Sequence, residues 1–181
     1  ELVSSIVKNI EFLDREQIRK LVNKKDTEGK TVFHLCFEYE CTSILKRLLN
    51  CVTKIGDKCD FIEKDDKKGN TPLHYVKNID LLREAERFLG GQFVKVCNYK
   101  NKLGRNVLMQ YVSELILMND KSKEVVKFLL ESYDYTSRDS EGKSLEMLMV
   151  EKDDEFFYDC LKSIVKEKRF NKNQKDNAGN N

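Results

Sequence analysis

One short pattern recurs along the chain and constrains its fold more than any other feature. An Asp or Asn is followed three residues later by glycine, and a hydroxyl or amide side chain comes two residues after that glycine. The copies are "DTEGKTVFHLC" from Asp26, "DKKGNTPLHYV" from Asp66, "NKLGRNVLMQY" from Asn101 and "DSEGKSLEMLM" from Asp139, and "DNAGNN" from Asp176 repeats the opening. Successive glycines at 29, 69, 104, 142 and 179 are 40, 35, 38 and 37 residues apart. This period predicts small stacked supersecondary units.

Each copy predicts a tight turn that leads into a helix. Glycine tolerates positive φ, and the Asx side chain bonds its own backbone. Thr31, Thr71, Asn106 and Ser144 are N-cap residues, and Pro72 suits a first helical position. A short apolar helix follows, and then a longer amphipathic one: "TSILKRLLN", "IDLLREAERFLG", "SKEVVKFLLES" and "EFFYDCLKSIV". The sequence therefore predicts an all-α fold of stacked helix-turn-helix units.

The first 25 residues lack the glycine turn but retain helical periodicity. Apolar residues from Val3 to Leu13 form one face, Ile18, Leu21 and Val22 form another, and Asp14 is a candidate N-cap between them. Terminal units of a stack are commonly degenerate, so we expect a cap. The predicted organisation is a single domain, 1–181, with a cap at 1–25, repeats at 26–65, 66–100, 101–138 and 139–175, and the start of a further repeat at 176–181.

The segment "DKKGNTPLH" resembles the ankyrin repeat, whose signature runs D-x-x-G-x-T-P-L-H-x-A-A. "DTEGKTVFHL" is similar to it, the last two full copies are more divergent, and the resemblance covers residues 26 to 181. It implies an ankyrin-repeat solenoid with a degenerate N-terminal capping repeat. It also implies that His34 and His74 bond backbone and cap groups between units, which makes them structural rather than catalytic or metal-binding.

The resemblance further implies a surface for another protein, formed by the turn tips and the exposed side of the inner helices. The tip positions are Thr27, Glu28, Lys30, Lys67, Lys68, Asn70, Lys102, Leu103, Arg105, Ser140, Glu141 and Lys143. The inner-helix positions are Glu38, Tyr39, Asn78, Ser113, Glu114, Glu151 and Lys152. Tyr39 and Leu103 are the expected apolar anchors, because binding hot spots are commonly aromatic and centrally placed.

Charge and insertions suggest where a partner binds. Lys67, Lys68, Lys102 and Arg105 occupy the two middle tips without an acid at the variable positions, which favours an acidic peptide or helix as partner. The segments 51–64, 90–100 and 113–123 lengthen the connections and are expected to loop out. Such insertions either bind a partner or are tolerated drift, and the sequence does not choose between the two.

Other classes of function find little support in the sequence. The 33 basic and 31 acidic residues leave a net charge of +2, which argues against nucleic acid, although 165–175 is locally basic. No apolar run reaches the length of about 18 residues that spans a bilayer, and the opening residues lack the pattern of a secretory signal. Six cysteines without CxxC spacing are expected to be reduced and to bind no metal, which favours a cytoplasmic or nuclear location.

No nucleophile, phosphate-loop or metalloprotease motif is present, so we expect a non-catalytic protein-interaction module without a cofactor. Two alternatives remain open on the divergent repeat spacing. The chain also resembles the ankyrin regions of fungal Swi-type transcription cofactors and those of Varp-like endosomal Rab regulators. A third hypothesis is a nucleotide- or oligonucleotide-sensing ankyrin domain, which would need aromatic and lysine side chains on the concave face, where Tyr39 is the one aromatic candidate.

Overall fold

The computed structural model describes residues 12–54, 65, 67–166 and 175–179, and the regular secondary structure in these ranges is helical. The all-α prediction is therefore confirmed for this part of the chain. Residues 1–11, which include the first predicted cap helix, lie outside the described ranges. The elements are α2 (Arg15–Asn23), α3 (Val32–Glu38), α4 (Thr42–Lys54), η2 (Pro72–Tyr75), α5 (Ile79–Leu89), η3 (Gly90–Gln92), α6 (Phe93–Cys97), α7 (Val107–Glu114), α8 (Asp120–Leu130), α9 (Leu145–Val150) and α10 (Glu155–Lys166).

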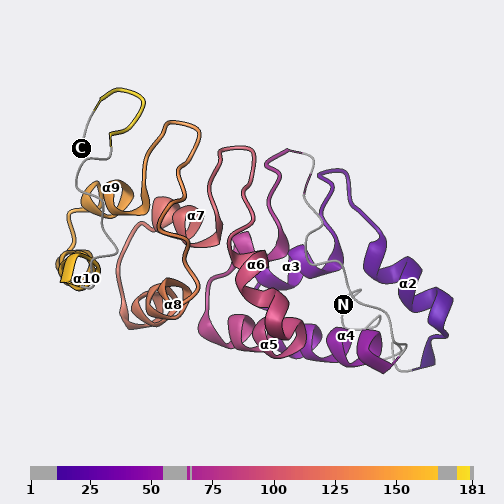
Figure 1. Ribbon diagram of the computed structural model, residues 1–181. Helices are drawn as coiled ribbons and strands as arrows, with labels where there is room; N and C mark the ends of the chain where they lie inside the picture. Colours follow the sequence, from indigo (N-terminus) through magenta and orange to yellow (C-terminus); the bar gives the residue numbers. More distant parts are fainter. Residues whose placement is uncertain (1–11, 55–64, 66, 167–174, 180–181) are drawn as a thin grey trace.

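The helices lie in two rows. The inner row runs α3, η2, α7, α9, in which each element packs on the next, and α4, α5 and α8 pack in the same order in the outer row. We define a unit as an inner helix together with the loop before it and the outer helix after it. The units are α3–α4, η2–α5, α7–α8 and α9–α10. The loops lie in a row along one edge, at the top of the view (Figure 1).

Local capping explains where the inner helices begin. Asn106 and Ser144 accept the backbone N–H of Met109 and Met147, as their residue types predict. Thr31 and Thr71 are N-caps in a different way, because the Nδ1 atoms of His34 and His74 accept their backbone N–H groups at 3.0 and 3.1 Å. Asp14 caps α2 and completes a capping box with Gln17, so the predicted cap residue is confirmed.

Apolar side chains from both rows form one continuous core. Phe33 and Phe37 of α3, Leu45 of α4 and Phe157 of α10 are almost completely buried. Cys36, Tyr111, Val112 and Met149 of the inner helices are also buried in this core. Burial of such side chains contributes about 25 cal/mol for each Å² of apolar surface removed from water, and it holds short helices that would not persist alone.

The insertions behave in three different ways. The expectation that 90–100 loops out is wrong, because it forms η3 and α6, which pack on α5 and bury Phe93, Val96 and Cys97. Within 113–123, residues 113–114 end α7 and residues 120–123 begin α8, so residues 115–119 alone form the connection between the two helices. The first residues of 51–64 extend α4, and residues 55–64 lie outside the described ranges.

The loops of neighbouring units are joined through their backbones. The N–H groups of Lys102, Ser140 and Asn177 donate to the carbonyl oxygens of Lys68, Leu103 and Glu141 at 2.9, 2.8 and 2.8 Å. These donors and acceptors occupy the same positions in successive loops, so the register is constant. The last bond joins residues 175–179 to the fourth unit in the same way as the third loop joins the second.

The loop of the second unit begins one residue earlier than predicted. The backbone N–H of Asp65 donates to the carbonyl of Asn70 at 3.0 Å, which is the bond that Asp26, Asn101 and Asp139 make in their loops. Asp65 therefore takes the place that the sequence pattern assigned to Asp66, which lies outside the described residues. The extra residue follows Asp65, and the loop still closes at Gly69.

Candidate interaction surface

The loops carry an exposed row of side chains, which we call the loop edge. It consists of Thr27, Lys67, Lys68, Lys102, Leu103 and Ser140. Leu103 is the large apolar side chain of this row, and it is half exposed. Its own carbonyl accepts the Ser140 N–H, so the side chain is presented from a backbone that is fixed on both sides.

Two of the predicted tip residues do not point outward. Asn70 is 1% exposed, because its carbonyl meets the Nε2 atom of His34 at 3.0 Å and its side-chain oxygen accepts from Asn101. Lys30 bonds Glu38 at 3.0 Å and lies over the ring of Tyr75. Burial lowers the pKa of Lys30, but the hydrogen bond and charge of Glu38 outweigh this effect and raise the pKa above its usual value. Both residues therefore hold the loops together.

Acidic side chains from neighbouring loops neutralise part of the predicted basic patch. Lys67 pairs with Glu28, and Arg105 donates from Nε to Asp139 at 3.2 Å. The hydrogen bond from Lys67 and a second one from Lys30 hold the pKa of Glu28 below its usual range. Lys67 and Arg105, two of the four cations that favoured an acidic partner, therefore have acidic partners within the chain. The side chains of Lys68 and Lys102 are exposed.

At the fourth unit the predicted tip residues also pair with each other. Lys143 lies 3.1 Å from Glu141 and 2.8 Å from Glu151, and the hydrogen bond with Glu151, followed by that with Glu141, raises the pKa of Lys143. Ser140 remains exposed, and its carbonyl accepts from the side chain of Asn177 at 3.1 Å. Lys143 is therefore paired with two acids of its own unit.

Most of the predicted inner-helix positions lie at the C-terminal ends of the inner helices, and the loops lie at the N-terminal ends. Glu38 ends α3, and Tyr39 follows it with 69% of its surface exposed. Ser113 donates its hydroxyl to the carbonyl of Gln110, and Glu114 accepts from the Gln110 side chain. Tyr39 and Leu103 come from opposite ends of the inner helices, so they do not form one patch.

The assignment of Asn78 to an inner helix is wrong. Its side chain accepts the backbone N–H of Leu81 at 3.1 Å and caps α5, and its amide donates to Glu40. The reason is that η2 ends after one turn, at Tyr75, and the chain is extended from Val76 to Asn78. Asn78 therefore belongs to the outer helix and joins the first two units.

One exposed apolar site was not among the residues predicted from the sequence. Ile116 and Leu117, in the connection from α7 to α8, are 92% and 77% exposed, and Val150 at the end of α9 is 65% exposed. Lys152, which follows α9, donates to the carbonyl oxygens of Ser113 and Leu115 at 2.8 Å each, so the two connections lie side by side. The sequence signal was the apolar run "LILM" inside an otherwise polar insertion.

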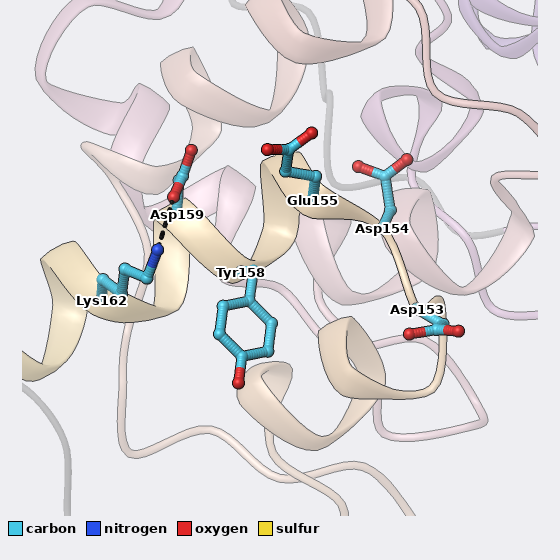
Figure 2. A pocket seen from close by; sticks show the side chains of 6 residues that line it. All are labelled: Asp153, Asp154, Glu155, Tyr158, Asp159 and Lys162. Carbon is cyan, nitrogen blue, oxygen red and sulfur yellow. Dashed lines mark hydrogen bonds and ion pairs between the residues drawn. The ribbon is translucent and has the colours of Figure 1, made fainter.

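Two hollows lie on α10. Figure 2 shows the first, of about 290 Å³, in which Asp153, Asp154 and Glu155 surround the start of the helix and Tyr158 and Lys162 complete the wall. Asp154 accepts the Phe156 N–H at 2.9 Å, and Lys162 bonds Asp159 at 3.1 Å, so part of this charge is used locally. The second hollow, of about 590 Å³, lies between α8 and α10 with Leu130, Phe156 and Ile164 among its lining residues.

The described part of the chain contains five free cysteines, and three of them are buried. Cys36, Cys41, Cys51, Cys97 and Cys160 are free thiols. Burial raises the pKa of both Cys36 and Cys97 to about 12, which keeps these thiols protonated. Within the described ranges no group of three or more His, Cys, Asp or Glu side chains is arranged to hold a metal ion.

None of the helices described here combines the length and apolar character needed to cross a membrane. The chain matches no protein-family model and no curated protein sequence.

Proposed function

We propose that the chain is a divergent ankyrin-repeat domain that binds another polypeptide inside the cell and catalyses no reaction. The observation that carries the proposal is the constant register of the backbone bonds between successive glycine loops. Repeat stacks of this kind offer an extended surface instead of a deep pocket. Such a surface suits a peptide or protein, which makes many shallow contacts, better than a small molecule, which needs enclosure.

The two histidines support the structural part of this proposal. The Nε2 atom of His74 meets the carbonyl oxygen of Arg105 at 3.1 Å, while its Nδ1 atom accepts from Thr71. His34 makes the equivalent bonds to Asn70 and Thr31. Both ring nitrogens of each residue are therefore engaged by backbone groups of two units, which leaves neither imidazole to act as a base, nucleophile or ligand.

We place the binding surface on the loop edge, with Leu103 as its apolar anchor. Lys68 and Lys102 flank it, so a partner segment with an apolar side chain beside one or two acids matches this stretch best. The free thiols support an intracellular, reducing location, because unpaired cysteines are normal there and rare in secreted proteins.

A random peptide library displayed on phage tests the proposal with the chain of residues 1–181. Peptides selected on the immobilised chain are synthesised, and their affinities are measured by fluorescence anisotropy. For peptides that bind the loop edge, Leu103→Ser and Lys68→Glu are expected to weaken binding by about tenfold, and Lys68→Glu also to reduce the salt dependence.

Val94→Ser is the matched control, because Val94 on α6 has nearly the same exposed fraction as Leu103, 52% against 50%, and lies away from the loop edge. A selection that yields no peptide above background argues against a polypeptide-binding function. Selected peptides that tolerate both loop-edge substitutions leave that function in place but remove its assignment to the loop edge.

A further inference from the structure

The connection from α7 to α8 displays two apolar side chains in an unusual way. Four apolar residues follow one another from 115 to 118. Leu115 and Met118 are partly buried and pack on the core, whereas Ile116 and Leu117 point away from it and are largely exposed. Exposed loops are normally polar, and large contiguous apolar exposure on a folded protein commonly marks a contact site.

Both ends of this connection are fixed. The N–H of Leu115 donates to the carbonyl of Tyr111 at 3.1 Å, and Lys152 holds the carbonyl of Leu115 from the fourth unit. At the other end, Asn119 accepts the Ser122 N–H at 3.0 Å and begins α8. Ile116 and Leu117 are thus presented in a preset arrangement, which reduces the entropy that a binding partner would otherwise have to remove.

Acidic residues predominate around the two side chains. Glu114 precedes them, Asp120 follows them with its side chain fully exposed, and Val150, the last residue of α9, is followed by further acids. The acids in these two connections and the first turns beside them are Glu114, Asp120, Glu151, Asp153, Asp154 and Glu155. The lysines in the same stretches are Lys121, Lys123 and Lys152. Lys123 lies 3.7 Å from Asp120, and Lys143 of the fourth loop lies 2.8 Å from Glu151. The ammonium of Lys152 is enclosed by two carbonyl oxygens, so acids still outnumber lysines around the apolar pair.

We propose that Ile116, Leu117 and Val150 form a second docking surface, which takes a basic amphipathic segment of a partner protein. Such a segment places its apolar side chains on Ile116 and Leu117 and its lysines or arginines opposite the surrounding carboxylates. An acidic peptide or an anionic membrane surface is repelled by the same carboxylates. The inference rests on the proposed polypeptide-binding function but uses the opposite end of the inner helices from the loop edge.

The experiment uses the peptide library and the complete chain described above, with a second round of selection on the double variant Ile116→Ser/Leu117→Ser. Both side chains are exposed, so the variant is expected to fold, and circular dichroism and thermal unfolding check this. Peptides enriched on the wild-type chain but not on the double variant are expected to carry net positive charge with apolar residues at helical spacing. Their affinity is expected to be at least tenfold higher for the wild-type chain.

Two further variants test whether the carboxylates contribute to binding and whether the peptides bind away from the loop edge. Asp120→Lys/Asp153→Lys is expected to weaken the same peptides at low salt by a factor that shrinks as salt is added. Leu103→Ser, on the loop edge, is expected to leave their affinity unchanged. If Leu103→Ser weakens these peptides and Ile116→Ser/Leu117→Ser does not, the second surface is refuted while the polypeptide-binding function stands.

Three other results overturn the inference. One is that peptides dependent on Ile116 and Leu117 prove to be acidic. Another is that no selected peptide depends on these residues. The third is that the wild-type chain, but not the double variant, sediments with vesicles of phosphatidylcholine and phosphatidylserine, which would identify the apolar pair as a membrane contact.

Discussion

The junctions between units differ sharply along the stack. At the first two junctions a buried histidine crosses from one unit to the next, His34 to the carbonyl of Asn70 and His74 to the carbonyl of Arg105. At the third junction the corresponding residue is Met109, which is completely buried in the core and offers no hydrogen-bond donor. The inner row is thus joined by a buried polar bond at two junctions and by apolar packing at one.

The third junction, like the first, also has contacts around its centre. Arg105 donates to Asp139, whose side chain is 1% exposed, and the amide of Asn98 donates to the carbonyl of Ser132 at 2.7 Å. Lys152 reaches back to the third unit from the end of α9. A buried polar bond specifies one geometry, whereas several peripheral bonds around an apolar centre achieve the same packing with less dependence on any one residue.

The largest expected effect distinguishes the junctions through their loop glycines. Gly104 has φ +71°, and a Cβ there would lie 2.7 Å from the Ser140 backbone nitrogen, so Gly104→Ala combines backbone strain with a backbone clash. We expect a loss of about 3 to 4 kcal/mol in the free energy of unfolding, measured by urea denaturation. At the second junction, a Cβ on Gly69 first meets the Lys102 side chain at 3.0 Å and the Lys102 backbone nitrogen at 3.1 Å, so Gly69→Ala should cost less.

Gly179→Ala is the control for the glycine comparison. Its φ is +86°, but no atom lies within 4 Å of the added Cβ, so the backbone strain of about 1 kcal/mol acts alone. Equal losses for Gly104→Ala and Gly179→Ala would mean that the close approach of the third and fourth loops contributes nothing.

Leucine substitutions at the histidine position compare the junctions directly. His74→Leu leaves the Thr71 N–H and the Arg105 carbonyl without their buried partner, for which we expect a loss of about 2 to 3 kcal/mol. Met109→Leu conserves the apolar chemistry and should cost about 1 kcal/mol or less. Chemical denaturation of both variants measures the difference, and similar losses would show that the histidine bonds add little to packing.

Replacing a buried acid in the fourth unit with an apolar residue is expected to increase stability. Glu146 is 5% exposed, one of its oxygens has no hydrogen-bond partner, and the first three units carry Phe33, Leu73 and Leu108 at the corresponding position. Its charge acts on Tyr133, whose pKa is raised first by burial and then by Glu146. Glu146→Leu is expected to raise the free energy of unfolding by about 1 kcal/mol, because an imperfectly solvated carboxylate is removed.

Thermal unfolding at neutral pH measures this gain. Glu146→Gln keeps the shape without the charge and separates charge from packing. A loss of stability in Glu146→Leu would show that the carboxylate has a bonding role in the fourth unit.

The smallest expected effect is a change in pH dependence at the second loop. Burial raises the pKa of Asp65, but hydrogen bonds from the Tyr75 hydroxyl and the Lys68 N–H outweigh it and lower the pKa below its usual value. Asp65 therefore stabilises the fold above its unfolded pKa, and this contribution is lost as pH falls through its folded pKa. Asp65→Asn, which matches Asn101 in the third loop, should flatten the decline of the free energy of unfolding between about pH 4 and pH 2.

Urea denaturation across that range, with Asp14→Asn as a surface control, measures the slope. An unchanged slope in Asp65→Asn would mean that this carboxylate gains no stability from its loop.

Short-range features were the ones that the sequence could predict. The glycine loops, the caps at Asp14, Asn106 and Ser144, and the outer helices depend on neighbours within a few residues, so residue type and spacing were sufficient. The helix α6 was missed because "GGQ" is typical of a break, and the burial of Phe93 and Val96 against α5 outweighs that local preference.

The candidate surface was less predictable because it depends on which loops are neighbours. Nothing near Lys67 in the sequence indicates Glu28 as its partner, 39 residues away, and the burial of Asn70 follows from bonds to His34 and Asn101. Asn78 was misassigned because the early end of η2 shifts it to the next helix. Only the exposure of Ile116 and Leu117 had a local signal, the apolar run in a polar insertion.

The bonds between neighbouring loops use main-chain atoms at both ends. The contacts that join the loops are therefore independent of the side chains that the loops expose. Replacing the side chain of Lys102, Leu103 or Ser140 alters what the edge offers to its surroundings but removes no atom from the bonds that Lys102 N–H, Leu103 C=O and Ser140 N–H make. Mutational drift at these positions is therefore free to change the side chains that the edge exposes while the scaffold beneath stays assembled.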